Sequence, residues 1–227
     1  MVGDARSIDA SAWGAWARAG ADRWDVLGRS WTTFARNTTE LIDLLNRAAD
    51  LTLALTLMND DRQADGFWPE LDQRLHNQLA SMGTLIDHSR RLIKYYRPDA
   101  PTLAAEYEAH KASVIATDEA AFLGDLRNYL LHYSLPAVVQ TLTMGAGTAR
   151  HAIKLSSPRL LEWDNWSPQA HAYLSGFGPR DGPVLGADIA AYSNAMRGFY
   201  TWLFDQRPVV RSMNNAPARF RIDTPAT

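Results

Sequence analysis

The chain has 227 residues, of which 46 % are hydrophobic and 21 % are charged, a balance typical of one folded domain. It contains no cysteine, which excludes disulfide scaffolds, thiolate zinc sites, iron–sulfur clusters and thiol nucleophiles. The formal net charge of −2 argues against a protein that coats nucleic acid through bulk positive charge.

Arginine is far more frequent than lysine, with 20 arginines against 3 lysines. Codon use in a G+C-rich genome explains most of such an excess. Some arginines can instead be placed to bind phosphate through two N–H groups, which lysine does poorly. The position of an individual arginine is needed to separate the two explanations.

Nothing in the sequence predicts a secreted or membrane protein. The first residues lack the apolar run of a signal peptide. The longest apolar stretch, residues 51–58, is too short to span a bilayer. We therefore expect a cytoplasmic protein with no membrane partner.

Aromatic residues at helical spacing open the chain. Trp24, Leu27, Trp31 and Phe34 fall on one face of a helix. A short helix around Trp13 and Trp16 is expected before it, with a break near Gly20. Packing in a bundle explains these tryptophans better than base stacking does.

A second helix is predicted to start at the cap-like segment 37–40 and to close between residues 59 and 66. Its expected buried side contains Leu41, Leu44, Leu45, Ala48, Ala54 and Leu55. A third helix is predicted over 69–96, with an apolar stripe formed by Leu71, Leu75, Leu79, Met82, Ile86 and Ile93.

Two further helices are predicted before the pattern changes. The fourth begins at Pro101 and reaches about residue 115. The fifth begins at residues 117–119 and is stopped by Pro136. Its expected buried stripe is Phe122, Leu126, Tyr129, Leu130 and Tyr133.

The last third combines a hairpin with short helices. Residues 137–143 and 149–155 alternate like strands around a Gly-x-Gly turn, which predicts a β-hairpin. Helices are expected over 157–163, 167–174 and 185–204. The prediction is one mainly α domain over 1–206, divided into N-terminal helices (1–36), a core bundle (37–134), the hairpin (135–156) and C-terminal helices (157–206), followed by a flexible tail (207–227).

One short segment carries candidate chemistry. On the fifth helix, Asn128 and His132 share a face and Arg127 flanks it. Arginine can bind a phosphate and neutralise charge in a transition state, and histidine can move a proton near neutral pH. An arginine at this spacing from a histidine also occurs by chance, and on spacing alone a polar helix face in water is the simpler explanation.

The pattern Arg127-Asn128-x-x-x-His132 resembles the signature of the HEPN superfamily, in which a polar residue follows the arginine and four to six residues separate the arginine from the histidine. The segments 76–90 and 126–136 also resemble uncharacterised bacterial HEPN-like proteins. The resemblance covers about residues 37–206, and it implies a HEPN-like antiparallel helical bundle.

The resemblance implies a metal-independent endoribonuclease that needs no cofactor and leaves a 2′,3′-cyclic phosphate. In that activity His132 would transfer the proton and Arg127 would bind the phosphate. Asn128 would orient one of these two side chains. Two copies would form a homodimer with the motifs facing across a shared cleft. RNA is the implied substrate, a role as a toxin or in phage defence is implied, and an antitoxin or regulatory protein is an implied partner.

Supporting residues are proposed on the third helix. Asp87, His88 and Arg91 share one side with Thr84, so they would line the same cleft, or Asp87 would pair with Arg127; a solvated face is the alternative. Tyr133 is a further candidate beside His132.

The sequence departs from one branch of the family. Ser134 stands where toxins silenced by nucleotidyltransferases carry a tyrosine, which puts that form of silencing in doubt. No metal-ligand pattern is present among the six histidines. Two other functions stay open: a non-catalytic HEPN-like module that binds RNA, a nucleotide or a partner protein, and a purely structural helical dimer.

Overall fold

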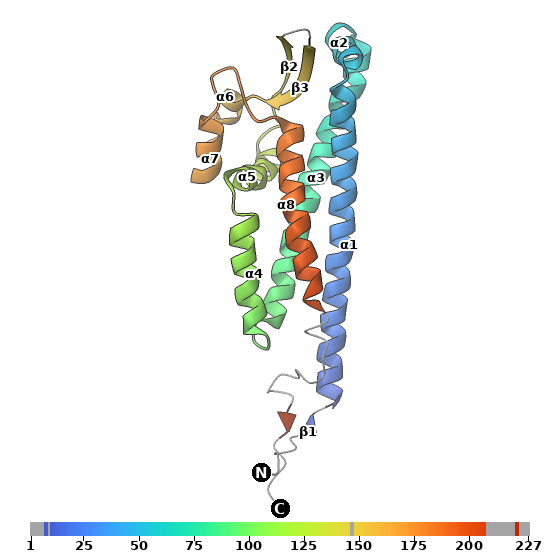
Figure 1. Ribbon diagram of the computed structural model, residues 1–227, viewed down its shortest axis with the longest axis vertical. Coiled ribbons are helices and arrows are strands. Elements are labelled where there is room, and N and C mark those ends of the chain that lie inside the picture. Colours follow the sequence, from blue (N-terminus) through green and yellow to red (C-terminus); the bar gives the residue numbers. More distant parts are fainter. Residues whose placement is uncertain (1–6, 9, 146–147, 208–220, 223–227) are drawn as a thin grey trace, which may run out of the picture.

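The computed structural model describes residues 7–8, 10–145, 148–207 and 221–222 (Figure 1). Its helices are α1 (Ala10–Ala48), α2 (Leu51–Asn59), α3 (Asp61–Tyr96), α4 (Pro101–Val114), α5 (Asp118–His132), α6 (Ser157–Leu160), α7 (Pro168–Ser175) and α8 (Leu185–Asp205). Its strands are β1 (Ser7–Ile8), β2 (Val138–Gly145), β3 (Thr148–Leu155) and β4 (Arg221–Ile222). The predicted mainly helical fold, with a hairpin before the C-terminal helices, is confirmed.

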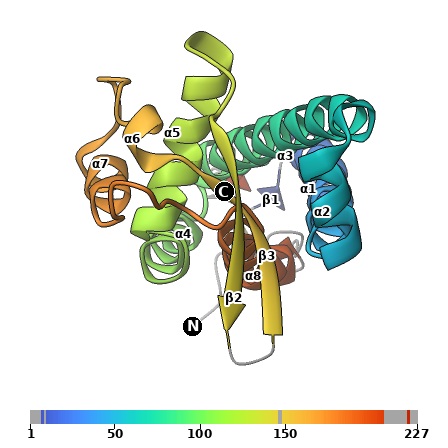
Figure 2. The same ribbon diagram turned by 90° about the horizontal axis from the view of Figure 1, so that it is seen from above.

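Two long helices, α1 and α3, lie side by side, and α8 packs against them (Figure 1). α5 crosses the bundle, and α6 and α7 lie beyond it (Figure 2). The hairpin of β2 and β3 sits at the end of the bundle where α2 lies, and β1 pairs with β4 near the opposite end. The largest buried side chains include Trp24, Phe34, Phe122, Phe199 and Tyr200.

The expected break near Gly20 is wrong, because α1 runs without interruption through it. Gly20 is buried, and a Cβ atom at this position would collide with the Tyr96 hydroxyl of α3. The glycine therefore allows close helix packing instead of ending the helix. Trp13 and Trp16 are buried in the core, as packing side chains should be.

The expected helix start at residues 37–40 is also wrong, so the division at residue 36 falls inside α1. The hydroxyls of Thr38 and Thr39 donate to the carbonyls of Phe34 and Ala35, one turn back in the same helix. Such side-chain bonds to residue i−4 occur within helices, whereas a cap accepts from N–H groups ahead of it. The next helix instead begins after Asp50, whose side chain accepts from the Leu53 N–H.

α3 begins at Asp61, eight residues before the predicted start at Pro69. The Asp60 carboxylate accepts from the backbone N–H groups of Arg62 and Gln63 and caps the helix. Pro69 lies inside α3. The predicted burial of Leu55 and Tyr133 is wrong, since these side chains are 43 % and 53 % exposed.

The predicted flexible tail falls largely on residues 208–220 and 223–227, outside the described residues. Arg207 pairs with Asp25 of α1 at 2.8 Å. Arg221 and Ile222 pair with Ser7 and Ile8, an arrangement that the sequence did not predict. Flexibility of the remaining tail stays a prediction.

A partly buried carboxyl lies where α8 meets α7 and α5. Burial raises the pKa of Asp188 to about 6 from an ordinary value of 3.8; the Tyr173 hydroxyl opposes this rise by hydrogen bonding, and Glu119 adds to it. Between about pH 4 and pH 6, the Asp188 carboxyl is therefore ionised in the unfolded chain but still largely protonated in the folded chain. The free energy of unfolding therefore falls as pH rises from about 4 to about 6.

We expect Asp188→Asn to raise the free energy of unfolding by about 1 kcal/mol at pH 7, because solvent screening reduces the penalty of this partly exposed group. At pH 4 the gain should disappear. Urea unfolding at the two pH values measures both. Asp205→Asn, at the exposed end of α8, is the control. An equal gain at pH 4 and pH 7 would contradict the assignment to Asp188 ionisation.

Candidate functional site

The C-terminal half of α5 carries the three motif residues. Thr117 caps the helix by accepting from the Ala120 N–H. One face of α5 enters the core through Phe122, Leu123, Leu126 and Tyr129. Asn128 and His132 lie on the opposite side and are exposed, as the predicted polar face requires.

Asn128 and His132 line one pocket of about 610 Å³. Its other walls are Tyr133 and the segment 162–165, Glu-Trp-Asp-Asn, which follows α6. This volume is within the range of small-ligand pockets. The structure therefore brings two of the three motif residues together around an open space.

Aromatic packing holds the segment 162–165 against α5. The ring of Trp163 meets Trp166 edge-on at 4.9 Å and Tyr129 edge-on at 5.6 Å, measured between centroids. Trp166 is buried and donates from Nε1 to the Leu160 carbonyl at 2.8 Å. Trp166 therefore serves as a packing side chain, whereas half-buried Trp163 both packs and lines the pocket.

A hydrogen bond fixes the far end of the same segment. The Asp125 carboxylate on α5 accepts from the Ser167 backbone N–H at 2.7 Å. The Ser167 side chain in turn caps α7 by accepting from the Ala170 N–H. α5 is thus connected to the start of α7, and the intervening pocket wall is supported at both ends.

Arg127 does not line this pocket; it lies across α3 at Gly83. A Cβ atom on Gly83 would stand 2.6 Å from the Arg127 Nε and 3.0 Å from its Cζ, so only glycine leaves room for the guanidinium here. The Arg127 Nε is buried, and no hydrogen-bond partner for it exists among the described residues. Arg127 therefore occupies the face of the bundle next to the pocket.

Carboxylates shape the electrostatics of the pocket. Glu162 and Asp164 are exposed and face the same space as His132. They can accept a proton or hold a protonated imidazole, but they also repel a phosphate that has no cation beside it. Burial raises the pKa of Tyr129 behind the pocket, and a hydrogen bond with Ser134 opposes that rise.

The supporting residues predicted on α3 lie elsewhere. Asp87 pairs with Arg90 at 3.5 Å and not with Arg127. His88 and Arg91 line a groove between α3 and α1, so they do not share the pocket of His132. Tyr133 does line that pocket, beside His132.

Sequence reasoning missed the wall formed by Glu162, Asp164 and Asn165. These residues lie some thirty positions after His132, in a segment without regular periodicity. The polar run beside Trp163 was a visible signal, but nothing in its spacing connects it to α5. The two segments meet only in the folded chain, through the packing of Trp163 and Trp166 on Tyr129 and the hydrogen bond from Ser167 to Asp125.

Across the described ranges, no helix is long and apolar enough to cross a membrane. The same residues contain no group of three or more histidine, aspartate or glutamate side chains placed to hold a metal ion. No family model matches the chain, and neither a curated protein nor a solved structure matches it.

Proposed function

We propose that this chain is a HEPN-type endoribonuclease that cleaves RNA without a metal ion. The observation that carries the proposal is the pocket in which His132 and Asn128 meet Trp163 and two carboxylates. A proton-transfer group, an amide and an aromatic ring around one space suit a nucleotide and its phosphate. A cytoplasmic location and a role as a toxin or in phage defence belong to the same proposal.

The reaction is a transfer within the RNA. The 2′-oxygen forms a bond to the adjacent phosphorus, and the bond from phosphorus to the 5′-oxygen of the next nucleotide breaks. His132 moves one proton in this exchange, either from the 2′-hydroxyl or to the departing 5′-oxygen. A carboxyl of Glu162 or Asp164 handles the other, because both line the same pocket.

Arg127 supplies positive charge next to the pocket. Its guanidinium lies over Gly83, where the Nε is buried without a described partner, so the terminal Nη groups would contact a phosphate that reaches across α3. Asn128 positions the nucleotide through its amide. These assignments keep the roles that the HEPN resemblance implies.

A homodimer is part of the proposal. Leu131, Tyr133 and Leu135 flank His132 and are 41 %, 53 % and 62 % exposed. Neighbouring exposed apolar side chains are typical of an interaction surface. A second copy docked there would enclose the pocket and bring a second Arg127 near it. A monomer at working concentrations, measured by analytical ultracentrifugation, would contradict this part.

The proposal is tested with a labelled RNA oligonucleotide and the full chain in excess chelator. We expect cleavage products that end in a 2′,3′-cyclic phosphate. A single 2′-deoxy nucleotide at the mapped site should lower cleavage there by about 100-fold or more, because the attacking oxygen is missing. Cleavage that persists at the deoxy position, or that requires an added divalent cation, would contradict the mechanism.

The position of Arg127 favours one alternative, a non-catalytic module that binds RNA, a nucleotide or a protein. Here the guanidinium does not line the pocket, and two carboxylates do. Oligonucleotide binding without any cleavage, unchanged in His132→Ala, would support this alternative over the nuclease.

A further inference from the structure

A second concave surface lies between α1 and α3, away from the pocket of His132. It consists of two adjoining pockets of about 660 and 390 Å³, which share Val26 and His88. Together they extend from Asp22 to Thr33 along α1, about 16.5 Å at the rise of a helix. We call this surface the α1–α3 groove. Its elongated form suits an extended strand better than a compact ligand.

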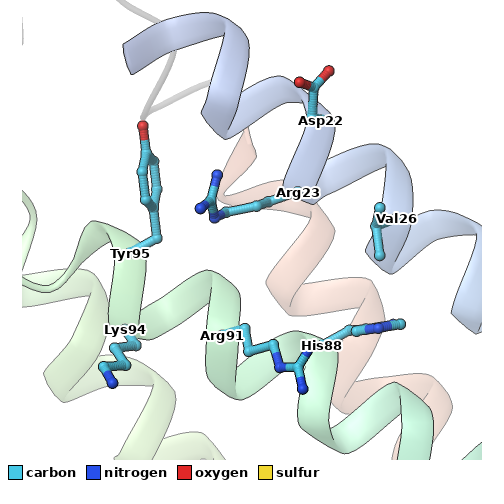
Figure 3. Close-up of a pocket in the computed structure, with 7 residues that line it drawn as sticks. All are labelled: Asp22, Arg23, Val26, His88, Arg91, Lys94 and Tyr95. Atoms are coloured by element: carbon cyan, nitrogen blue, oxygen red, sulfur yellow. The ribbon is translucent and has the colours of Figure 1, made fainter.

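Cationic side chains dominate the α1–α3 groove. They are Arg23 and Arg29 from α1, and His88, Arg91 and Lys94 from α3, with histidine charged only when protonated. Asp22 is the carboxylate among the lining residues, and in Figure 3 it points away from α3. In the described part of the chain, Arg29, Arg91 and Lys94 form no ion pair. The groove therefore presents positive charge that the fold leaves uncompensated.

Two of these groups are held in place. The Arg23 guanidinium stacks 4.0 Å above the centre of the Tyr95 ring and donates to the Ala19 carbonyl at 2.8 Å (Figure 3). Across the groove, Ser30 donates to the Val26 carbonyl, so it accepts from the His88 Nδ1 at 2.6 Å. The other ring nitrogen of His88 is thereby left for a ligand. Groups fixed in advance lose less entropy when they bind.

The opposite end of the α1–α3 groove, where Arg29 lies, is rich in hydroxyl groups. Hydroxyls of Ser30, Thr33, Ser81 and Thr84 line it. Hydroxyl groups suit ribose and base edges, whereas guanidinium and ammonium groups suit phosphates. Thr84 also neighbours Gly83, over which Arg127 lies. Successive residues of a helix point about 100° apart, so a strand leaving this end of the groove would cross over α3 to reach Arg127.

We infer that the α1–α3 groove binds the phosphodiester backbone of single-stranded RNA, with phosphates at Arg23, Arg91 and Lys94. The choice of ligand rests on the proposed function; the groove itself does not. The strand crosses α3 near Gly83 and Arg127 before it enters the pocket of His132. Asp87 is a carboxylate on the outer face of α3, and Arg90 pairs with it.

Neighbouring arginines on α3 provide a matched test. Arg91 lines the groove, whereas Arg90 does not and pairs with Asp87; both side chains are exposed. Arg91→Gln and Arg90→Gln remove the same charge from adjacent positions on one helix. Binding of a 2′-O-methyl RNA oligonucleotide, which cannot be cleaved, is measured by fluorescence anisotropy at several salt concentrations. Circular dichroism checks that both variants fold.

We expect Arg91→Gln to raise the Kd by about fivefold and to reduce the salt slope of log K by about 0.7, the value for one phosphate contact on a single strand. Arg90→Gln should change the Kd by less than about twofold, because it keeps the groove intact. Equal losses in the two variants would show diffuse attraction and overturn the inference. So would tight binding of adenosine diphosphate with the same dependence on Arg91, or no binding of the oligonucleotide.

The two proposals fail separately. If binding depends on Arg91 but ordinary RNA is not cleaved, the nuclease proposal is wrong and RNA binding in the groove is supported. If RNA is cleaved but binding does not depend on Arg91, the nuclease proposal is supported and RNA binding in the groove is wrong.

Discussion

Replacing His132 by alanine is expected to lower RNA cleavage by about 100-fold or more, the usual contribution of a general acid or base. The side chain is exposed at the end of α5, so its removal takes little packing from the core. Initial rates on a labelled RNA, with excess enzyme and excess chelator, measure the effect. The melting temperature should stay close to that of the unmodified chain.

The matched control is His171→Ala, which removes another exposed histidine from a helix. His171 lies on α7 and hydrogen-bonds to Ser175 in the same helix. Its loss should leave cleavage unchanged. Equal activity in His132→Ala and in the unmodified chain would rule out the proposed site, whatever else the protein does to RNA.

Replacing Gly182 by alanine is expected to lower the free energy of unfolding by about 3 kcal/mol. Gly182 is buried, and a Cβ atom there would collide with the Leu155 carbonyl oxygen, a backbone atom that no rotamer change can move away. The loop around it joins the end of β3: Leu155 donates to the Pro183 carbonyl at 3.0 Å, and Ser157 donates to the Asp181 carbonyl at 3.4 Å.

Gly178→Ala tests whether the effect depends on that close approach. Gly178 is in the same loop, but it is exposed and nothing lies within 4 Å of a Cβ atom added there. Its replacement should change stability by less than about 0.5 kcal/mol. Urea denaturation of both variants gives the comparison, and similar midpoints would contradict the packing argument.

Periodicity predicted the helices that bury one regular face. α4, α5 and α8 lie close to their predicted ranges, and the hairpin is where alternation and glycine placed it. These features depend on neighbours along the chain, so local pattern is sufficient. α5 illustrates this well, because its polar face carries Asn128 and His132 into solvent as expected.

Predictions from local pattern were wrong where a residue contacts a segment that is distant in the sequence. A glycine is typical of a helix end, but Gly20 lies inside α1, where Tyr96 packs against it. Asn37 resembles the start of a cap, yet its side chain donates to the Asn77 carbonyl on α3. Both residues look like local helix-end signals, but each contacts a residue of α3. A single sequence does not show such distant contacts.

The chemistry divides in the same way. Composition excluded thiol chemistry, and the spacing of Asn128 and His132 predicted their shared face, because both follow from residue type and helix geometry. The tertiary structure decided what surrounds that face. Packing of Trp163 on Tyr129 brings two carboxylates to His132. Gly83 has no side chain, which leaves space for Arg127 to lie on α3. Contacts between distant segments depend on complementary shape, so they are settled only when the chain packs.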